Sequence, residues 1–245
     1  VWVVPVGTQD PVWRDGDHLY VAGTATAEDI KISHELDTTV GGIEGAMELM
    51  GSLPIRNRAT IAGNVVNASP IGDMTIIFLA LDAEVALVRK KKRRRLLLRD
   101  FFCGYKELDL AAGEMVEWLR FPADQTSTLF NFEKISKRTH LDIASVNSAA
   151  SFRVESGRIA RAVISAGGVA PIPMQLQRTA EFLEGRLPDA ETALRAAGIA
   201  RGEVTPISDV RGSAEYKSLL LGQLILAHFQ VLFEIDDRHL VEAVS

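Results

Sequence analysis

The feature that most constrains the fold is an apolar run at residues 74–81, MTIIFLAL, which directly follows a segment of small and polar residues at 56–73. The run predicts a short buried helix, because it offers almost no polar face to solvent. Asp73 stands immediately before it and is predicted to be its N-cap. The small polar segment, RNRATIAGNVVNASPIGD, must therefore lie against the beginning of a buried element.

Composition and charge narrow the class of protein. The chain has 245 residues, of which 47% are hydrophobic and 24% charged, as in an ordinary globular protein of one or two domains. A net charge of −5 disfavours nucleic acid as a partner, because that binding depends on neutralising phosphates. We find no apolar run of bilayer length and no secretory signal, and we expect no membrane partner and a cytoplasmic location. The start at Val1, on VWVVPV, leads us to expect a fragment or a processed subunit.

Residue patterns predict mixed α and β structure in the first half of the chain. Strands are predicted at 18–23, 84–88, 96–102 and 115–122. Helices are predicted at 26–30 and at 42–53, the second ended by Pro54. Seven consecutive cations at 89–95, RKKKRRR, are interpreted as a solvated hairpin tip rather than as an RNA-binding or membrane-binding surface.

The second half of the chain repeats this mixed character. A strand is predicted at 129–136, and two more flank a turn at 155–157. Helices follow at 179–185 and 190–200, and a long amphipathic helix at 211–233 is predicted to turn inward the side chains of Leu219, Leu220, Leu224, Ala227 and Val231. The polar stretch DQTST is a plausible linker, so we predict two α+β domains at 1–125 and 126–245.

Several common kinds of site are excluded by their motifs. The chain has no P-loop sequence, no G-x-G-x-x-G after a strand and no G-x-S-x-G elbow. Its five histidines are scattered, without HExxH, so we expect no metal site in this chain. The single cysteine, Cys103, excludes an internal disulfide and a cluster held by four thiolates, and its aromatic neighbours predict a buried thiol.

The sequences TIAGN and ASPIGD remain as the candidate site. Gly63 lets the backbone approach a ligand closely, while Thr60 and Asn64 supply hydroxyl and amide donors four residues apart. Consecutive backbone N–H groups beside such side chains would suit a phosphate or pyrophosphate. Asp73 could accept from a sugar hydroxyl or only cap the next helix. The alternative is a small-residue turn that packs two elements together, and the residues alone leave both possibilities open.

The longer sequence IRNRATIAGNVVNASPIGD resembles the second flavin-binding segment in the FAD subunits and domains of the molybdenum hydroxylases. The similarity continues in FFCGYK, GEMVEWLRFP, FEKISKRTHLDIASVNSA and ISAGGVAPIP, and covers most of the chain. It implies a two-domain α+β flavoprotein. An FAD-binding domain of the PCMH type would be followed by a smaller domain of the carbon monoxide dehydrogenase flavoprotein C-terminal type.

The resemblance implies that the first group of site residues lies in the small polar segment. Thr60, Gly63 and Asn64 would hold the FAD pyrophosphate and the neighbouring ribityl groups. Three further residues would lie close to the cofactor, namely Ala59, Val66 and Asn67.

Three more residues are implied farther along the chain. Asp73 would hydrogen-bond FAD, Val116 would make an apolar contact with it, and Lys134 would reach the cofactor. Without the resemblance, Val116 is equally well explained as an ordinary core residue and Lys134 as the solvent side of a strand.

A loop at 136–143 would lie beside the isoalloxazine ring and affect access of the electron acceptor. Its expected participants are Arg138, Asp142 and Ile143. A surface ion pair between Arg138 and Asp142, of little energetic value, is the alternative.

The implied function is that of the FAD-binding component of a molybdenum hydroxylase, with xanthine dehydrogenase as the first candidate. Electrons would pass from iron–sulfur clusters through FAD to NAD⁺, and the 2Fe-2S clusters and molybdopterin would belong to partner chains or to a missing segment. The alternatives are the FAD subunit of a carbon monoxide, aldehyde or N-heterocycle hydroxylase, or a non-redox module that uses the basic hairpin. The family also has an earlier Gly-rich FAD-binding segment, which we expect on a preceding piece or on another chain.

Overall fold

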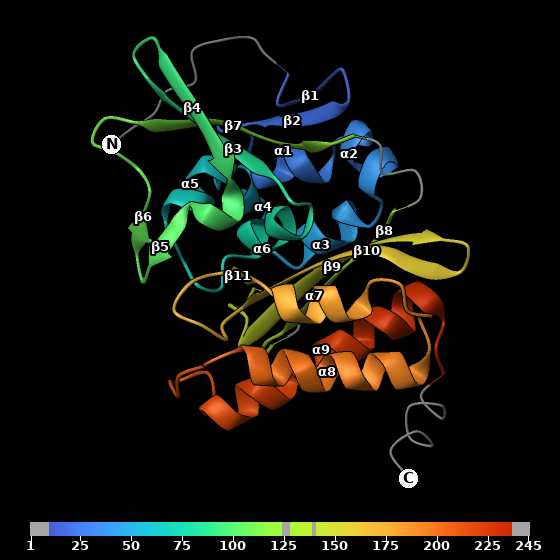
Figure 1. Ribbon diagram of the computed structural model, residues 1–245. Coiled ribbons are helices and arrows are strands. Elements are labelled where there is room, and N and C mark those ends of the chain that lie inside the picture. Colours follow the sequence, from blue (N-terminus) through green and yellow to red (C-terminus); the bar gives the residue numbers. More distant parts are fainter. Residues whose placement is uncertain (1–9, 124–127, 139–140, 237–245) are drawn as a thin grey trace.

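The computed structural model describes residues 10–123, 128–138 and 141–236 and shows two mixed α and β domains (Figure 1). This confirms the predicted two-domain α+β architecture. One layer of the first domain is an antiparallel sheet in the order β1-β2-β7-β3-β4. Its strands are β1 (Val12–Asp15), β2 (His18–Ala22), β3 (Glu84–Arg89), β4 (Lys92–Leu97) and β7 (Met115–Pro122).

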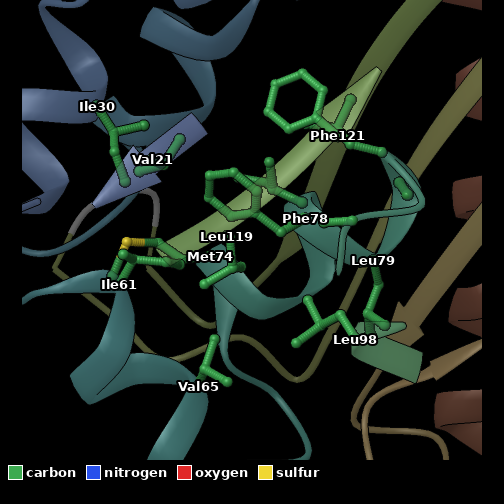
Figure 2. Close-up of a cluster of buried hydrophobic side chains, with 14 of the residues drawn as sticks. Val21, Ile30, Ile61, Val65, Met74, Phe78, Leu79, Leu98, Leu119 and Phe121 are labelled. Carbon is green, nitrogen blue, oxygen red and sulfur yellow. The ribbon is translucent and has the colours of Figure 1, made fainter. Parts of the chain in front are cut away.

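Six short helices cover one face of this sheet. They are α1 (Ala27–Lys31), α2 (His34–Val40), α3 (Ile43–Glu48), α4 (Leu53–Arg56), α5 (Ile61–Val66) and α6 (Asp73–Ala80). A 3₁₀ turn, η1 (Leu98–Asp100), and a small hairpin of β5 (Phe102–Gly104) and β6 (Glu107–Leu108) complete the domain. The predicted buried helix is α6, in which every residue after Asp73 is buried. Figure 2 shows Met74 and Phe78 of α6 among the apolar side chains of β2, α1, α5 and β7.

The second domain has a four-stranded antiparallel sheet in the order β11-β10-β9-β8, with three helices. Its elements are β8 (Thr128–Ile135), β9 (Val146–Glu155), β10 (Arg158–Gly167), β11 (Met174–Gln175), α7 (Gln177–Leu183), α8 (Ala190–Glu203) and α9 (Ala214–Phe233). In Figure 1 the helices α7, α8 and α9 lie together on the side of the sheet away from α6.

The second sheet belongs to both cores. Phe130, Phe132 and Ala149 pack into the core of the first domain, whereas Phe152 and Ala150 pack into the core under α8 and α9. Since side chains alternate between the faces of a strand, one face of this sheet contacts α6 and the other contacts its own helices. Helix α6 is therefore buried between two sheets, which explains why its sequence has no polar face.

Three local predictions differ from the structure in the first domain. Pro54 does not end a helix but lies in the first turn of α4, as its second residue, where its missing N–H is not needed. Asp73 is the first residue of α6 and makes no capping bond, because Gly72 is the N-cap. Cys103 is exposed rather than buried, because alternation in the short strand β5 points it away from the core that holds Phe102.

The basic run forms a hairpin as predicted, although its cations are not simply solvated. The turn is at residues 90–91, and the rest of the run lies within β3 and β4. Arg93 makes a bidentate ion pair with Glu117. Arg94 bonds Asp109 and Glu114, and its hydrogen bond lowers the pKa of Glu114 to about 2.

The long helix α9 corrects two predictions. Its buried residues are Lys217, Leu221, Gly222, Leu224, Ile225, His228 and Phe229, so that of the predicted set only Leu224 is confirmed as buried. The prediction failed because a buried histidine interrupts the apolar stripe. Leucines also occur on every side of the helix, so their positions did not identify the buried face. By length and composition α9 could also cross a bilayer, contrary to prediction, but here it packs against β8, β9 and α8.

A chain of hydrogen bonds explains the buried histidine. Nδ1 of His228 lies 3.0 Å from Asn131 Nδ2, which can only donate, so Nε2 carries the proton and donates to Ser148 Oγ at 3.0 Å. Ser148 Oγ donates to the carbonyl oxygen of Ser165 at 2.8 Å. The hydroxyl of Ser165 donates to the carbonyl oxygen of Ile76, on α6, at 2.6 Å.

We expect His228 to make the folded protein sensitive to acid. Burial lowers the pKa of His228 to about 3, against an ordinary value of 6.5. Between these values the unfolded chain binds a proton that the folded chain does not, so the free energy of unfolding falls as pH falls from 6.5 towards 3, by roughly 1 kcal/mol per pH unit from this group. Above pH 6.5 the group has no effect.

Denaturant unfolding of the wild type and of His228→Gln between pH 7 and pH 4 measures this contribution. The variant should be less stable at pH 7 but lose less stability on acidification, while the exposed control His34→Gln should follow the wild type. Parallel pH profiles for all three proteins would contradict the assignment.

Candidate functional site

Helix α5 places the candidate residues of the small polar segment. Thr60 is its N-cap, and its Oγ1 accepts from the N–H of Gly63 at 3.1 Å. The N–H groups of Ile61 and Ala62 donate to carbonyl oxygens of residues 25 and 23 at 2.9 and 3.0 Å. The expected row of free backbone N–H groups is therefore absent from this turn, because the loop after β2 already uses them.

The donors that α5 does offer are side chains. The amide oxygen of Asn64 accepts from the N–H and the hydroxyl of Thr75, at 3.1 and 2.9 Å, which leaves the two amide N–H donors of Asn64 for another acceptor. The hydroxyl proton of Thr60 is also unused by the capping bond. Gly63, Val66 and Asn67 are exposed, and the first turn of α5 carries no acidic residue that would repel an anion.

The end of β2, the start of α5 and the beginning of β7 meet at one point. A Cβ on Gly23 would lie 2.4 Å from the carbonyl oxygen of Val116, so only glycine fits there. Ala59, just before α5, accepts from the N–H of Ala27 at 2.8 Å. The side chain of Val116 belongs to the core of the first domain and lies at the edge of that core. This agrees with the alternative that Val116 is an ordinary core residue.

Asp73 and Lys134 form an ion pair between the two domains. Nζ of Lys134 donates to Asp73 Oδ2 at 2.8 Å and to the carbonyl oxygen of Leu49 at 2.9 Å. The two side chains are 13% and 5% exposed, respectively. Lys134 is therefore not on the solvent side of its strand, and its two known contacts face the first domain.

Asn147 is a third member of this cluster that the sequence analysis did not assign. Its Nδ2 donates to Asp73 Oδ1 at 2.6 Å and to the carbonyl oxygen of Ile71 at 3.3 Å, so both carboxylate oxygens of Asp73 have a donor. Its Oδ1 is buried without a hydrogen bond in the described structure, and a Cβ on Gly167 would approach that oxygen to 2.2 Å. The sequence did offer one indication of a role for Asn147, since it lies within the segment at 132–149 that resembles the flavoprotein family.

Electrostatics favour a tightly held cluster. Burial raises the pKa of Asp73, and the charge and hydrogen bond of Lys134, together with Asn147, act in the opposite direction. A buried carboxylate without such partners would take up a proton. Asn64 connects this cluster to α5 through Thr75, which lies two residues after Asp73.

The loop at 136–143 directly follows β8, the strand that carries Lys134. Arg138 Nε is 3.9 Å from Asp142 Oδ2, and the backbone N–H of Arg138 donates to the same carboxylate at 3.1 Å. Desolvation raises the pKa of Asp142, but the N–H of Ile143 and the charge of Arg138 outweigh it and leave the pKa below its ordinary value. Ile143 is exposed, and residues 139–140 lie outside the described residues. Within the part of the chain that the structure describes, Arg138, Asp142 and Ile143 make their hydrogen bonds and ion pairs within the loop and with Arg211 rather than with α5.

Two basic residues that the sequence analysis did not assign hold the small polar segment in place. Arg56 pairs with Glu28 of α1 at 2.6 Å and donates to the carbonyl oxygens of Met50 and Gly51. Lys106, after β5, donates to the carbonyl oxygen of Asn67 at 2.5 Å. The first and last parts of the segment are thus anchored while the exposed face of α5 stays open.

Comparisons with known proteins agree with this architecture. Residues 8–124 match the family described as FAD binding domain in molybdopterin dehydrogenase, and residues 132–231 match the CO dehydrogenase flavoprotein C-terminal domain. The fold superposes on carbon monoxide dehydrogenase from Hydrogenophaga pseudoflava with a TM-score of 0.87, at 24% identity over 91% of this chain and 77% of that chain. For quinoline 2-oxidoreductase from Pseudomonas putida 86 the TM-score is 0.78, at 25% identity over 96% and 79%.

The curated relatives include long chains, of which this chain matches a small part, and chains of similar length. A xanthine dehydrogenase from Blastobotrys adeninivorans is 33% identical over 66% of this chain but only 12% of that protein. The carbon monoxide dehydrogenase medium chain of Hydrogenophaga pseudoflava is 27% identical over 86% of this chain and 74% of that chain. The chain thus spans a small part of the first relative and most of the second.

Together the two matched domain families and the fold define a chain in which an FAD binding domain is followed by a CO dehydrogenase flavoprotein C-terminal domain. The chain belongs to the FAD-binding subunits and domains of the molybdenum hydroxylases. Within residues 10–123, 128–138 and 141–236, no group of three His, Cys, Asp or Glu side chains is placed to hold a metal ion.

The residues present fit FAD in part. Among the described residues, the hydroxyl proton of Thr60 and the amide N–H groups of Asn64 are donors without an assigned acceptor. With an exposed Gly63 and no acidic residue in the first turn of α5, they suit an anionic cofactor segment. The backbone N–H groups of that turn do not contribute, because they are already bonded. The exposed face of α5 would therefore offer FAD side-chain donors in place of a row of free backbone N–H groups.

We expect Asp73 and Lys134 to be strongly coupled. Asp73→Asn leaves a buried ammonium without its counter-charge and Lys134→Met leaves a buried carboxylate, so each should lower the free energy of unfolding by about 3 kcal/mol. The double variant should lose clearly less than the sum, with a coupling free energy above about 1 kcal/mol.

Denaturant unfolding of the two single variants and the double variant measures this coupling. The exposed pair of Arg153 and Glu155 provides a matched control, for which the coupling should stay under about 0.5 kcal/mol. Additive effects of Asp73→Asn and Lys134→Met would show that the ion pair does not hold the domains together.

Proposed function

We propose that this chain is the FAD-binding component of a heteromeric molybdenum hydroxylase, passing electrons from iron–sulfur clusters through FAD to an acceptor. The observation that carries the proposal is α5, where Thr60, Gly63 and Asn64 of the family's flavin-binding segment lie together on an open face. FAD, when bound, would supply the electron-transfer chemistry, while this chain binds it, orients it and shields it from water.

Within this proposal α5 holds the pyrophosphate side of the cofactor. Thr60 and Asn64 donate to it, Gly63 lets it approach closely, and Ala59, Val66 and Asn67 lie alongside. Val116 gives an apolar contact from the adjacent strand. The earlier Gly-rich segment of the family completes the clamp from a preceding part of the protein or from another chain.

Asp73, Lys134 and the loop at 136–143 have a second role in the proposal. The ammonium of Lys134, held at fixed distance by Asp73, places positive charge near the second domain, where it favours the reduced and more negative cofactor. Arg138, Asp142 and Ile143 lie on the exposed loop that we place beside the ring, where they influence access of the acceptor.

We propose partner chains for the remaining cofactors. Molybdopterin and 2Fe-2S clusters belong to a molybdopterin-binding subunit and an iron–sulfur subunit or domain, because this chain has a single cysteine. Medium chains of carbon monoxide dehydrogenases are among its relatives, which supports a separate subunit in a hetero-oligomer. We place the complex in the cytoplasm.

Two substrate classes remain as proposals. Xanthine, with NAD⁺ as acceptor and a role in purine catabolism, is supported by the sequence KRTHLDI and by 33% identity to a xanthine dehydrogenase. Carbon monoxide, an aldehyde or an N-heterocycle is supported by the medium chain relatives and by the fold of quinoline 2-oxidoreductase. Purification with the partner subunits and assay with each substrate separates the two.

The protein expressed from its complete coding sequence should be yellow, with a flavin absorption spectrum. Gly63→Ala should weaken the binding of FAD at least tenfold in a fluorescence titration. The Cβ of the new alanine would lie 3.0 Å from Thr60 Oγ1, on the face proposed to contact the cofactor. Gly45→Ala, in α3, is the matched control, since its Cβ would meet nothing within 4 Å. A colourless protein that takes up no FAD would overturn the proposed function, and equal effects of the two variants would remove α5 from the site.

Lys134→Met should weaken FAD binding or make its reduction potential more negative, because a positive charge near the reduced cofactor is lost. A spectroelectrochemical titration of the flavin measures the potential, and the rate of NAD⁺ reduction in the complex measures its consequence. Lys92→Met, on the exposed basic hairpin, should change neither. If Lys134→Met gives the wild-type titration and rate, Lys134 acts only in joining the domains.

A further inference from the structure

A pocket lies between the domains, away from the face of α5 that carries Thr60, Gly63 and Asn64. It has a volume of about 370 Å³ and is formed by the loop before α6, the turn between β5 and β6, the loop after β10 and the loop before α9. These segments gather on one side of the molecule, where β5 and β6 stand beside the ends of the second domain (Figure 1). Its lining residues include Ile71, Tyr105, Pro171, Ile207 and Lys217.

The pocket contains a buried cation. The side chain of Lys217 is 3% exposed, and its Nζ donates to Asp209 Oδ2 at 2.8 Å and to the carbonyl oxygen of Ile207 at 2.9 Å. An ammonium has three N–H donors, so one donor remains after these two contacts. Arg211 also lines the pocket, so two positive charges face the single negative charge of Asp209.

Exposed apolar side chains surround the pocket. Val210 is 87% exposed, Ile207 70% and Tyr105 65%. Scattered apolar residues on a surface are ordinary, but here they stand on segments that line one pocket or directly adjoin it. Aromatic and aliphatic side chains around a pocket with a few fixed polar groups are typical of a protein interface.

The loop that carries Val210 is held rigidly although its tip contributes nothing to the core. Asp209 and Gly212 exchange two backbone hydrogen bonds, at 3.0 and 3.2 Å. Lys137 Nζ donates to the carbonyl oxygen of Val210 at 2.9 Å, and Ser145 Oγ donates to that of Arg211 at 3.1 Å. A surface that is ordered before binding loses less conformational entropy when a partner docks.

We propose that this pocket and its apolar rim are the docking site for the electron-donating partner chain, which inserts an apolar side chain next to a carboxylate. The apolar side chain fills the pocket beside Tyr105 and Ile207. The carboxylate accepts from the remaining donor of Lys217 and pairs with Arg211, which matches the excess positive charge of the pocket.

The inference rests on the proposed function, because that function supplies the partner. The loop that carries Val210 and Arg211 also contacts the loop at 136–143, since Arg211 Nη1 donates to the carbonyl oxygen of Ile143 at 3.2 Å. A partner bound at Val210 would therefore stand next to the loop that we place beside the flavin ring. Docking there brings an electron donor to the cofactor rather than to the opposite side of the protein.

Co-expression with the molybdopterin-binding and iron–sulfur chains encoded beside this protein tests the docking site. With a tag on the iron–sulfur chain, Val210→Asp and Ile207→Asp should each reduce recovery of this chain at least tenfold. Neither side chain is packed in the core, so flavin content and melting temperature should stay at wild-type values. Val231→Asp, an exposed apolar position near the other end of α9, is the matched control and should leave recovery unchanged.

The possible outcomes separate this inference from the proposed function. Wild-type recovery with Val210→Asp and Ile207→Asp would overturn the docking site, even if the protein is yellow and active. Light scattering that shows a homodimer dispersed by Val210→Asp would also overturn it, because the surface would then bind a second copy. Absence of flavin from the wild-type complex would instead count against the proposed function. Failure of the wild-type chain to bind either partner would overturn both.

Discussion

Burial of one short helix between two sheets is the constraint on which the rest of the structure depends. Helix α6 packs against the first sheet's core on one side and against β9 and β10 on the other. Inside such a helix the backbone groups bond one another, whereas the polar groups at its ends need partners from outside the helix. The charged first residue, Asp73, therefore needs partners from the second domain, and Lys134 and Asn147 provide them.

The candidate cofactor site follows from this arrangement. Because α6 is fixed at its first turn by the cluster around Asp73, the contact of Thr75 with Asn64 also fixes α5. The open face of α5 thus has a defined position relative to the second domain, although no residue of α5 takes part in the ion pair itself. Binding energy for a cofactor need not be used to order the wall that receives it.

The sequence predicted the features that depend on local patterns and long motifs. The apolar run at 74–81 identified α6, and the longer segment around Gly63 identified the family. Prediction failed where a residue's surroundings come from distant parts of the chain. The backbone N–H groups of Ile61 and Ala62 are used by the loop after β2, which spacing along α5 could not reveal. The buried face of α9 includes His228, whose partners lie on β8 and β9, so composition alone pointed to the wrong face.

One face of the second sheet packs into the core of the first domain, and this limits how the sequences of such subunits can change during evolution. Phe130, Phe132 and Ala149 complete the core of the domain that precedes them, so the two matched regions do not have separate interiors. A chimera that joins the first domain of one relative to the second domain of another would replace one side of a packed core without the other. Recombination among these enzymes should therefore keep α6 and β8–β10 together as one inherited unit, and exchange would succeed more readily at the outer helices α7 and α8.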